Sequence, residues 1–347
     1  MTEKEQVYRI GITQGDINGV GYETILKTLV MPRMSEICTP LVYGSSKVAS
    51  YHRKLLKIGD FSFNIVKTAD QALPKKANMI NVVETEIKID IGQSTDIAGE
   101  MALLSLEMAM TDLLKNQIQA IVTSPINKKN IQSDLFHFSG HSEYLAQKAG
   151  VADYLMFMIC PAVRVGVVTD HISLQSVSAA ITPEKVLNKI RLMQKSLVID
   201  FNIRRPKIAV LGLNPHAGDD GLIGTEDGDV IFPAIRQAFD EDILAFGPYP
   251  ADGFFASGQF RKFDGVLAMY HDQGLIPFKL LSQDEGVNYT AGLPFVRTSP
   301  AHGTAYDIAG KDIASAESFR QALYLAVDIL NNRKQFRELI LKKTSSK

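Results

Sequence analysis

The stretch Val165-Gly166-Val167-Val168-Thr169-Asp170-His171 is an apolar run that ends in a polar imidazole. Two later stretches share this form, Ile208–His216 (IAVLGLNPH) and Gly265–His271 (GVLAMYH). Short, continuous apolar runs of this kind predict buried strands. A buried strand that ends in a histidine carries the side chain to the carboxyl edge of the sheet, where ligands bind in open α/β folds.

Three of the chain's seven histidines occupy this one context. A single histidine of this kind is more often a hydrogen-bonded structural residue, but three in equivalent positions favour a common site. Three neutral imidazoles bind a divalent metal and leave coordination positions open for substrate, as in catalytic sites. We therefore predict that His171, His216 and His271 bind one divalent metal ion, with zinc, cobalt and magnesium left open.

Strand-like runs alternate with helical patterns along the chain, which predicts an α/β fold with mostly parallel sheets. Helices are expected over 99–115, from Thr182-Pro183 as N-cap and first helical residue, and after Ser318 as a cap. The tail 342–347 is expected to be disordered. The first expected strands are 7–12, 40–43, 64–66, 79–83 and 120–122.

Three β-rich runs follow one another over 154–159, 164–169 and 176–181. Consecutive strands with short connections predict a meander at a sheet edge, where two subunits often meet. The first run is apolar throughout, more than one sheet face of a lone subunit would bury, so we expect a homodimer.

No Pro/Gly-rich linker divides the chain, so a second domain is expected to be inserted into the first. We predict a two-lobed α/β/α architecture. The first lobe would comprise 1–125 and 290–347, and the second 126–289 with the dimerisation strands. The active site is expected in the cleft between them.

The composition excludes several classes of protein. The net charge of −1 provides no basic field for nucleic acid or anionic membrane, and no apolar run approaches the roughly 20 residues that span a bilayer. Cys38 and Cys160 form no metal-binding spacing and are expected to be reduced. The polar N-terminus predicts no signal peptide, and we expect a cytoplasmic enzyme.

Several motifs carry groups suited to oxyanions. Gly15–Gly21 forms the first strand-to-helix turn, which is either an anion site or simply a tight turn. Residues 123–128 follow a strand and are expected at the same edge. Further candidates are a histidine–serine pair and three donors downstream of the third histidine: His141, Ser142, Lys279, Asn288 and Arg297.

The segment His302–Lys311 (HGTAYDIAGK) resembles the loop that holds the adenosine part of NAD in isocitrate and isopropylmalate dehydrogenases. This resemblance explains how a chain without the GxGxxG fingerprint could bind a dinucleotide. It implies that His302, Gly303, Thr304 and Asp307 contact NAD or NADP. Tyr306 stands where that family has proline.

With these motifs assembled, the whole chain resembles the 4-hydroxythreonine-4-phosphate dehydrogenase family of the isocitrate/isopropylmalate dehydrogenase-like superfamily. The most specific motifs are Gly212–Gly218 (GLNPHAG), Gly247–Asp252 (GPYPAD), Tyr270–Leu275 (YHDQGL) and Gly292–Thr298 (GLPFVRT). The family's metal ligands fall on the three strand-end histidines, and its substrate contacts fall on the five oxyanion candidates. Asp170 replaces the usual threonine and adds a carboxylate beside the metal.

The resemblance implies an NAD(P)-dependent, metal-dependent oxidation and decarboxylation of 4-phosphooxy-L-threonine to 3-amino-2-oxopropyl phosphate, with the active site shared across a homodimer. Asp252 and Lys279 are both candidates for proton transfer. A related dehydrogenase of threonate or erythronate 4-phosphate would share every motif. A more distant alternative is a non-redox metal-dependent lyase or acyl-phosphate transferase.

Overall fold

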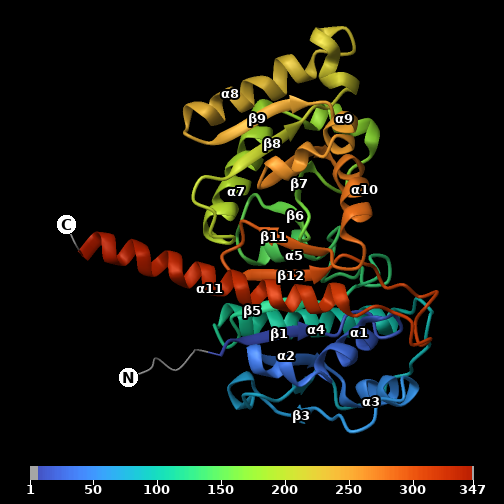
Figure 1. Cartoon of the computed structure of the whole chain (residues 1–347). Helices are drawn as coiled ribbons and strands as arrows, with labels where there is room; N and C mark the ends of the chain where they lie inside the picture. The colour runs from blue at the N-terminus through green and yellow to red at the C-terminus, as the bar shows by residue number, and fades with distance from the viewer. Residues whose placement is uncertain (1–6, 346–347) are drawn as a thin grey trace. The chain divides into compact units, whose positions relative to one another are not determined.

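The computed structural model describes residues 7–345, with the side chains of 343–345 excepted, and divides into two compact units. The first unit runs to Tyr144 and resumes over Phe295–Leu330. The second comprises Leu145–Pro294 and the chain from Asn331 onward. Figure 1 traces both. These divisions lie up to 19 residues from the expected 125/126 boundary (144 − 125), and the chain after Leu330 belongs to the second unit rather than the first.

The first unit is built on a parallel sheet in the order β3-β4-β2-β1-β5-β12. Its central strands are buried along their whole length, as expected for a parallel sheet covered on both faces. All five strands expected early in the chain are confirmed within a few residues. The strands are β1 Arg9–Thr13, β2 Thr39–Gly44, β3 Asn64–Ile65, β4 Asn78–Asn81, β5 Ala120–Thr123 and β12 Val296–Pro300.

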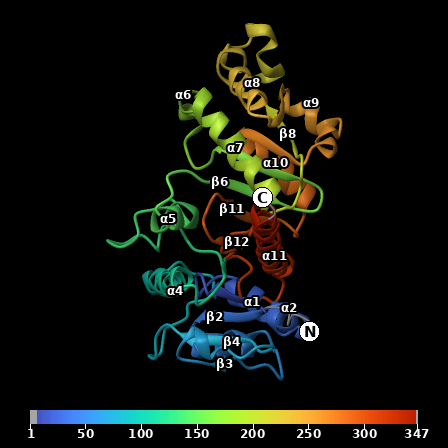
Figure 2. The same ribbon diagram turned by 90° about the vertical axis from the view of Figure 1, so that its left-hand side faces the viewer.

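The expected buried helix is α4, Asp96–Leu114. Thr95 caps it by accepting a hydrogen bond from the Ala98 backbone, and apolar residues are buried on most of its circumference because it packs on β1, β2 and β5. Figure 2 shows α4 and α2 on opposite sides of the sheet. The other helices early in the chain are α1 Gly21–Leu29, α2 Pro32–Ile37, α3 Ser46–Leu55 and the short η1 Ala69–Gln71.

The second unit has a mixed sheet in the order β11-β6-β7-β10-β8-β9, in which β6 pairs antiparallel with both of its neighbours. The remaining pairs are parallel. Figure 1 shows α7 and α10 on either side of β7. The strands are β6 Leu155–Ile159, β7 Arg164–Thr169, β8 Lys207–Leu211, β9 Leu244–Tyr249, β10 Gly265–Tyr270 and β11 Val287–Ala291.

The helices of the second unit include α7, Pro183–Ile199, whose predicted cap is confirmed because Thr182 accepts from the Lys185 backbone. Helix α5, His141–Lys148, spans the division between the units. The others are α6 Val177–Ala180, α8 Phe232–Asp240, α9 Ala251–Ala256 and α10 His271–Ser282, with the short turns η2 Leu174–Ser176, η3 Pro215–Gly221, η4 Asp227–Ile231 and η5 Gln259–Lys262.

The prediction of a third consecutive strand over 176–181 is wrong, because this segment forms the helical turns η2 and α6. Val177 and Ile181 are both buried and lie four residues apart, which is helical rather than strand spacing. The first two β-rich runs are confirmed as β6 and β7. The side chains of β6 are already buried within the chain, so they do not require a second subunit to cover them.

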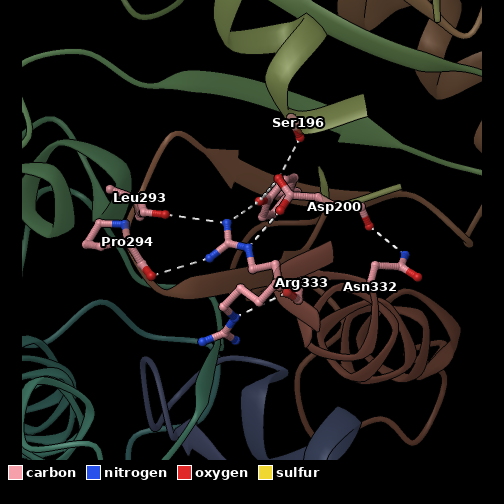
Figure 3. Close-up of polar contacts among 8 residues, drawn as sticks. Ser196, Asp200, Leu293, Pro294, Asn332 and Arg333 are labelled. Atoms are coloured by element: carbon pink, nitrogen blue, oxygen red, sulfur yellow. Dashed lines mark hydrogen bonds and ion pairs between the residues drawn. The ribbon is translucent and has the colours of Figure 1, made fainter. Parts of the chain in front are cut away.

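The last helix, α11, spans Glu317–Ser345, so the expected disorder over 342–345 is wrong, and 346–347 lie outside the described residues. Ser318 does not precede the helix as a cap; it lies inside it, and its hydroxyl accepts from the Ala301 backbone. Beyond Leu330, the helix binds the second unit through Arg333, which donates to Asp200, to the Tyr289 hydroxyl and to two backbone carbonyls (Figure 3).

None of the described helices is both long and apolar enough to cross a membrane.

Candidate active site

The three strand-end histidines lie in the second unit, after three neighbouring parallel strands in the order β7-β10-β8. His171 follows β7, His271 directly follows β10 and begins α10, and His216 lies in η3 after β8. The carboxyl ends of parallel strands meet at one edge of a sheet. The structure therefore gives the three histidines the strand-end context that the sequence predicts.

The imidazoles of His171 and His271 lie side by side, with their ring centroids 5.7 Å apart and their planes tilted by 43°. Each ring has its own carboxylate. Nδ1 of His271 lies 2.7 Å from Asp272, and Nδ1 of His171 lies 3.9 Å from Asp170. A carboxylate on Nδ1 orients an imidazole and directs Nε2 toward a metal. Both side chains remain about one-third exposed (38% and 34%).

His216 is exposed, and the structure gives no ring contact between it and the other two histidines. Within the described residues of one chain, no group of three side chains stands close enough to hold a metal ion. The chemistry and spacing of the His171–His271 pair fit two ligands of one ion. The role of His216 as the third ligand remains a prediction.

The segment that carries His216 has an unusual backbone. Five successive residues of η3 have left-handed φ angles, from 47° to 82°, and only one of them is glycine: His216, Ala217, Gly218, Asp219 and Asp220. L-residues with side chains disfavour this region, and such strain is retained mostly at functional sites. Apart from the glycines, no residue pattern in this stretch predicts the left-handed conformation.

The buried carboxylate of Asp227 holds the start of this segment in place. It accepts from the backbone of Leu213 at 2.7 Å and from the backbone and side chain of Asn214 at 3.1 and 3.0 Å. Asp227 is 2% exposed. Hydrogen bonds from neighbouring backbone, Asn214 and Ser178 lower the pKa of the adjacent Glu226 carboxyl, so Glu226 acts as an ionised acceptor.

The first unit contains the oxyanion group built around Arg297 on β12, which is 2% exposed. Its guanidinium donates to the Thr123 hydroxyl from Nε and Nη2, at 3.1 and 2.8 Å, and to the Ser142 hydroxyl at 3.5 Å. Burial lowers the pKa of His141 well below its usual value, and the charges of Arg297 and Lys128 lower it further. The structure thus brings together His141, Ser142 and Arg297.

Thr123 was expected at the sheet edge but not singled out as a partner of Arg297. The link depends on strand order, because β12 pairs with β5 although about 170 residues separate them in sequence. The signal available in the sequence was a hydroxyl at the end of an apolar run.

The other predicted site residues lie in the second unit. Asn288 lies on β11, and its Oδ1 is buried without a hydrogen-bond partner among the described residues. Lys279 on α10 and Asp252 on α9 are exposed, and neither forms a hydrogen bond or ion pair with a described residue. The contacts in the structure therefore do not decide whether Lys279 or Asp252 is the candidate for proton transfer.

The loop after β12 leaves one acceptor unsatisfied. Nδ1 of His302 lies 3.0 Å from the Gly303 carbonyl, which can only accept, so Nδ1 carries the proton and Nε2 is an acceptor. Nε2 is buried and has no partner among the described residues. Burial lowers the pKa of His302, which keeps the ring neutral. A ligand that donates a hydrogen bond would satisfy Nε2.

The same loop packs on the first strand-to-helix turn. The Val20 backbone donates to the Thr304 carbonyl at 3.0 Å, and the Tyr306 hydroxyl donates to Asp16 at 2.6 Å. A Cβ at Gly19 would lie 2.7 Å from the Thr304 carbonyl, so glycine is required there. These contacts favour the tight-turn interpretation of Gly15–Gly21 over an anion site, and they give Tyr306 an anchoring role.

The family model described as pyridoxal phosphate biosynthetic protein PdxA matches residues 36–326. The chain belongs to this family.

Curated relatives in the PdxA family extend over nearly the whole chain. A 4-hydroxythreonine-4-phosphate dehydrogenase from Bacteroides thetaiotaomicron is 51% identical over 96% of this chain and 91% of its own length. A protein from Oceanobacillus iheyensis, provisionally named D-threonate 4-phosphate dehydrogenase, is 39% identical over 92% of this chain and 97% of its own.

Solved structures support the same grouping. The crystal structure of 4-hydroxythreonine-4-phosphate dehydrogenase from Klebsiella pneumoniae has a TM-score of 0.81 at 32% identity and covers 94% of this chain and 99% of its own. Isocitrate dehydrogenase from Methylococcus capsulatus shares the fold alone, with a TM-score of 0.50 at 13% identity over 95% of this chain and 88% of its own. The predicted α/β, isocitrate-dehydrogenase-like fold is confirmed.

Proposed function

We propose that this PdxA-family chain is an NAD(P)-dependent dehydrogenase. It would oxidise and decarboxylate 4-phosphooxy-L-threonine to 3-amino-2-oxopropyl phosphate with the help of a divalent metal. The observation that carries this proposal is 51% identity across nearly the whole chain to a 4-hydroxythreonine-4-phosphate dehydrogenase. The described side chains support each part of the reaction separately.

The substrate brings a phosphate and a carboxylate, and the Arg297 group is suited to one of them. A guanidinium offers several donors in a fixed fork, which matches the oxygens of either anion. Because the pKa of His141 is lowered, its ring stays neutral at pH 7 and can donate to the anion without repelling Arg297. Ser142 adds a hydroxyl to the group.

In the second unit, Lys279 and Asn288 are the proposed contacts to other parts of the substrate. The unsatisfied Oδ1 of Asn288 is an acceptor, so it suits a donor such as the substrate's ammonium or hydroxyl group. Lys279 projects from α10, the helix that begins at His271, and offers a point charge to an anion.

The proposed metal ligands are His171, His216 and His271. They would hold a divalent metal, which would lower the pKa of the substrate's secondary hydroxyl and stabilise negative charge during decarboxylation. Asp272 lies 2.7 Å from Nδ1 of His271 and orients that ring, Asp170 stands 3.9 Å from Nδ1 of His171, and the strained η3 segment presents His216. Asp252 or Lys279 would transfer the proton.

The proposed cofactor contacts are His302, Gly303, Thr304 and Asp307. The unsatisfied Nε2 of His302 supports this assignment, because the exocyclic amine of adenine is a donor of the required kind. The proposal includes both NAD and NADP. Hydride transfer is the chemistry of the nicotinamide itself, and the protein binds and orients it.

We also propose that the enzyme is a homodimer in which histidines of both copies contribute to each metal site. Large apolar side chains are exposed within nine residues after each of the three histidines, with Leu222 82% and Leu280 77% exposed. The full set is Ile172 and Leu174, Leu222 and Ile223, and Ile276 and Leu280. Exposed apolar groups clustered along three neighbouring segments are typical of an interface.

Complementation tests this shared site. His171 and His271 are adjacent within one chain, so the informative mixture is His216→Ala with His271→Ala after unfolding and refolding together. Recovered activity in the mixture is the expected result. A fully active monomer in sedimentation would contradict the dimer.

The second candidate reaction is oxidation of D-threonate 4-phosphate, which the Oceanobacillus iheyensis relative favours. The two substrates differ in the substituent beside the carboxylate, an amine in one and a hydroxyl in the other. The deciding experiment follows NADH formation by absorbance with each substrate, with and without a chelator. Faster, chelator-sensitive turnover of 4-phosphooxy-L-threonine is expected, whereas turnover of threonate 4-phosphate alone would replace the first candidate with the second.

A further inference from the structure

In the second unit, a chain of hydrogen bonds through Thr169, Gln273 and Asp227 joins the three strand ends that carry the histidines. We call this chain the polar relay, and the proposed chemistry does not use it. It begins where the pairing of β8 with β10 stops. The two strands pair in parallel from Gly265↔Ile208 to Leu267↔Val210 and no further, although β10 continues to pair with β7 as far as Tyr270↔Thr169. Strand β8 therefore separates from β10 just before the histidine edge.

The side chain of Gln273 occupies this gap. Its Oε1 accepts from the Met269 backbone at 2.7 Å, and its Nε2 donates to the Gly212 carbonyl at 2.6 Å. Continuing the register by two residues from Leu267↔Val210 would place Met269 opposite Gly212. The amide thus substitutes for the missing rung of the ladder, because it accepts through its oxygen and donates through its nitrogen, as a backbone peptide does.

The relay extends in both directions from Gln273. On the β7 side, the Thr169 hydroxyl donates to the Met269 carbonyl at 2.8 Å, two residues before His171. On the β8 side, Gly212 leads into the segment that Asp227 holds through the Leu213 and Asn214 backbones. The three strand ends are therefore tied together at the backbone rather than through the imidazoles.

Helix α10 can place Gln273 in the gap because the next residue is glycine. A Cβ at Gly274 would lie 2.9 Å from Val165 and 3.0 Å from Ala268, so any side chain would push the helix away from β7 and β10. Gln273 and His271 lie on the same first turn of this helix. A shift of that turn would move His271 and release the His216 segment together.

We propose that Gln273 is a positioning residue for the metal site, because it sets the spacing between the His216 segment and the strand end that carries His271. This inference rests on the proposed metal ligands. It holds whether one or two chains supply the three imidazoles, since the relay fixes both segments within the same unit. Groups that orient metal ligands typically change metal affinity by about 10–100-fold when they are removed.

The test is a titration of the metal-free full-length chain with Co²⁺, followed by its visible absorption, for the parent protein and for Gln273→Met. We expect the variant to bind Co²⁺ at least about tenfold more weakly and with an altered absorption band. Gln237→Met is the matched control, because Gln237 is exposed on α8 and its side chain has no described partner. The control should bind like the parent.

Gln273→Glu provides a second variant with nearly the same shape, in case Gln273→Met does not fold. It retains an acceptor for Met269 but has no donor for the Gly212 carbonyl, so weaker binding is again expected. If a folded Gln273 variant shows unchanged Co²⁺ affinity and absorption, the positioning role of Gln273 is overturned, while the proposed metal site stands. A parent protein that binds no Co²⁺ would overturn the metal site itself, and the inference with it.

Discussion

Two polar clusters of the second unit differ in how their charges are satisfied. Around Asp200 and Arg333, the carboxylate accepts from Arg333 and from the Ser196 hydroxyl (Figure 3). It also accepts from the Tyr289 hydroxyl, and the Asp200 and Arg333 side chains are largely buried. At the histidine edge, the His171 and His271 side chains are one-third exposed, the η3 backbone is strained, and apolar side chains face outward. A buried cluster whose charged and polar groups satisfy one another indicates a role in the fold. Exposed histidine side chains beside a strained backbone indicate a role in binding.

The largest expected effect lies at the histidine edge. His271→Ala should abolish turnover while the chain stays folded, because a side chain that is one-third exposed at a strand end contributes little to core packing. Steady-state rates together with circular dichroism melting provide the measurement. His137→Ala, a change at an exposed histidine of the first unit, is the control and should keep full activity. Turnover that survives in His271→Ala would remove this residue from the metal site.

The buried cluster should behave in the opposite way. Asp200→Ala leaves Arg333 without its carboxylate, and breaking a buried ion pair typically costs about 3–5 kcal/mol of the free energy of unfolding. Urea unfolding provides the measurement, and the KM of the protein that remains folded should not change. The exposed Lys88–Asp90 pair is the comparison, since its loss should cost about 0–1 kcal/mol. Equal losses of unfolding free energy for the two ion pairs would show that the Asp200–Arg333 pair does not have the structural role assigned to it.

Arg297 in the first unit is buried like Arg333, but we propose that it binds substrate rather than stabilising the fold. Substitution of Arg297 tests this difference. Arg297→Lys keeps the charge but loses the fork, so the KM for the phosphorylated substrate should rise by about tenfold or more, with a small change in stability. The measurement is initial rate against substrate concentration. An unchanged KM would place Arg297 with Arg333 as a residue of the fold.

The smallest expected effect concerns a third buried polar group, His52 on α3. Its Nε2 donates to the Ile17 carbonyl at 2.9 Å, and burial lowers its pKa from 6.5 to about 4. Between pH 6.5 and 4 the unfolded chain binds the proton and the folded chain does not, so stability falls as the pH is lowered through this range. The slope from one proton is at most about 1.4 kcal/mol per pH unit.

Unfolding free energies of the parent and of His52→Gln at several pH values measure this contribution. The variant should lose that part of the slope. A parallel pH dependence in the two proteins would show that His52 does not titrate in this way.

Local patterns in the sequence were sufficient for most elements of the fold. Apolar runs predicted β1 to β8 and β10, whereas β9, β11 and β12 were not predicted, and Thr182-Pro183 predicted the start of α7. The error at 176–181 arose because Val177 and Ile181 suit a strand by composition, whereas their spacing is helical. The end of α11 was missed because a charged tail also suits disorder.

The sequence was sufficient to predict which residues belong to the candidate site, but not which of them contact one another. The strand-end histidines were visible as a pattern, and the structure adds the contact between His171 and His271. Thr123 beside Arg297 and the Gln273 relay depend on strand order and on the point where two strands separate. Neither is encoded in any short stretch of sequence.

The most direct test of the central claim is the metal content of the purified chain by elemental analysis, alongside activity before and after chelation. We expect about one divalent metal per chain. We also expect loss of the metal in His171→Ala, His216→Ala and His271→Ala, and recovery of activity when metal is restored to the chelated parent. A chelated, metal-free parent that retains full activity would show that the three histidines do not form a catalytic metal site.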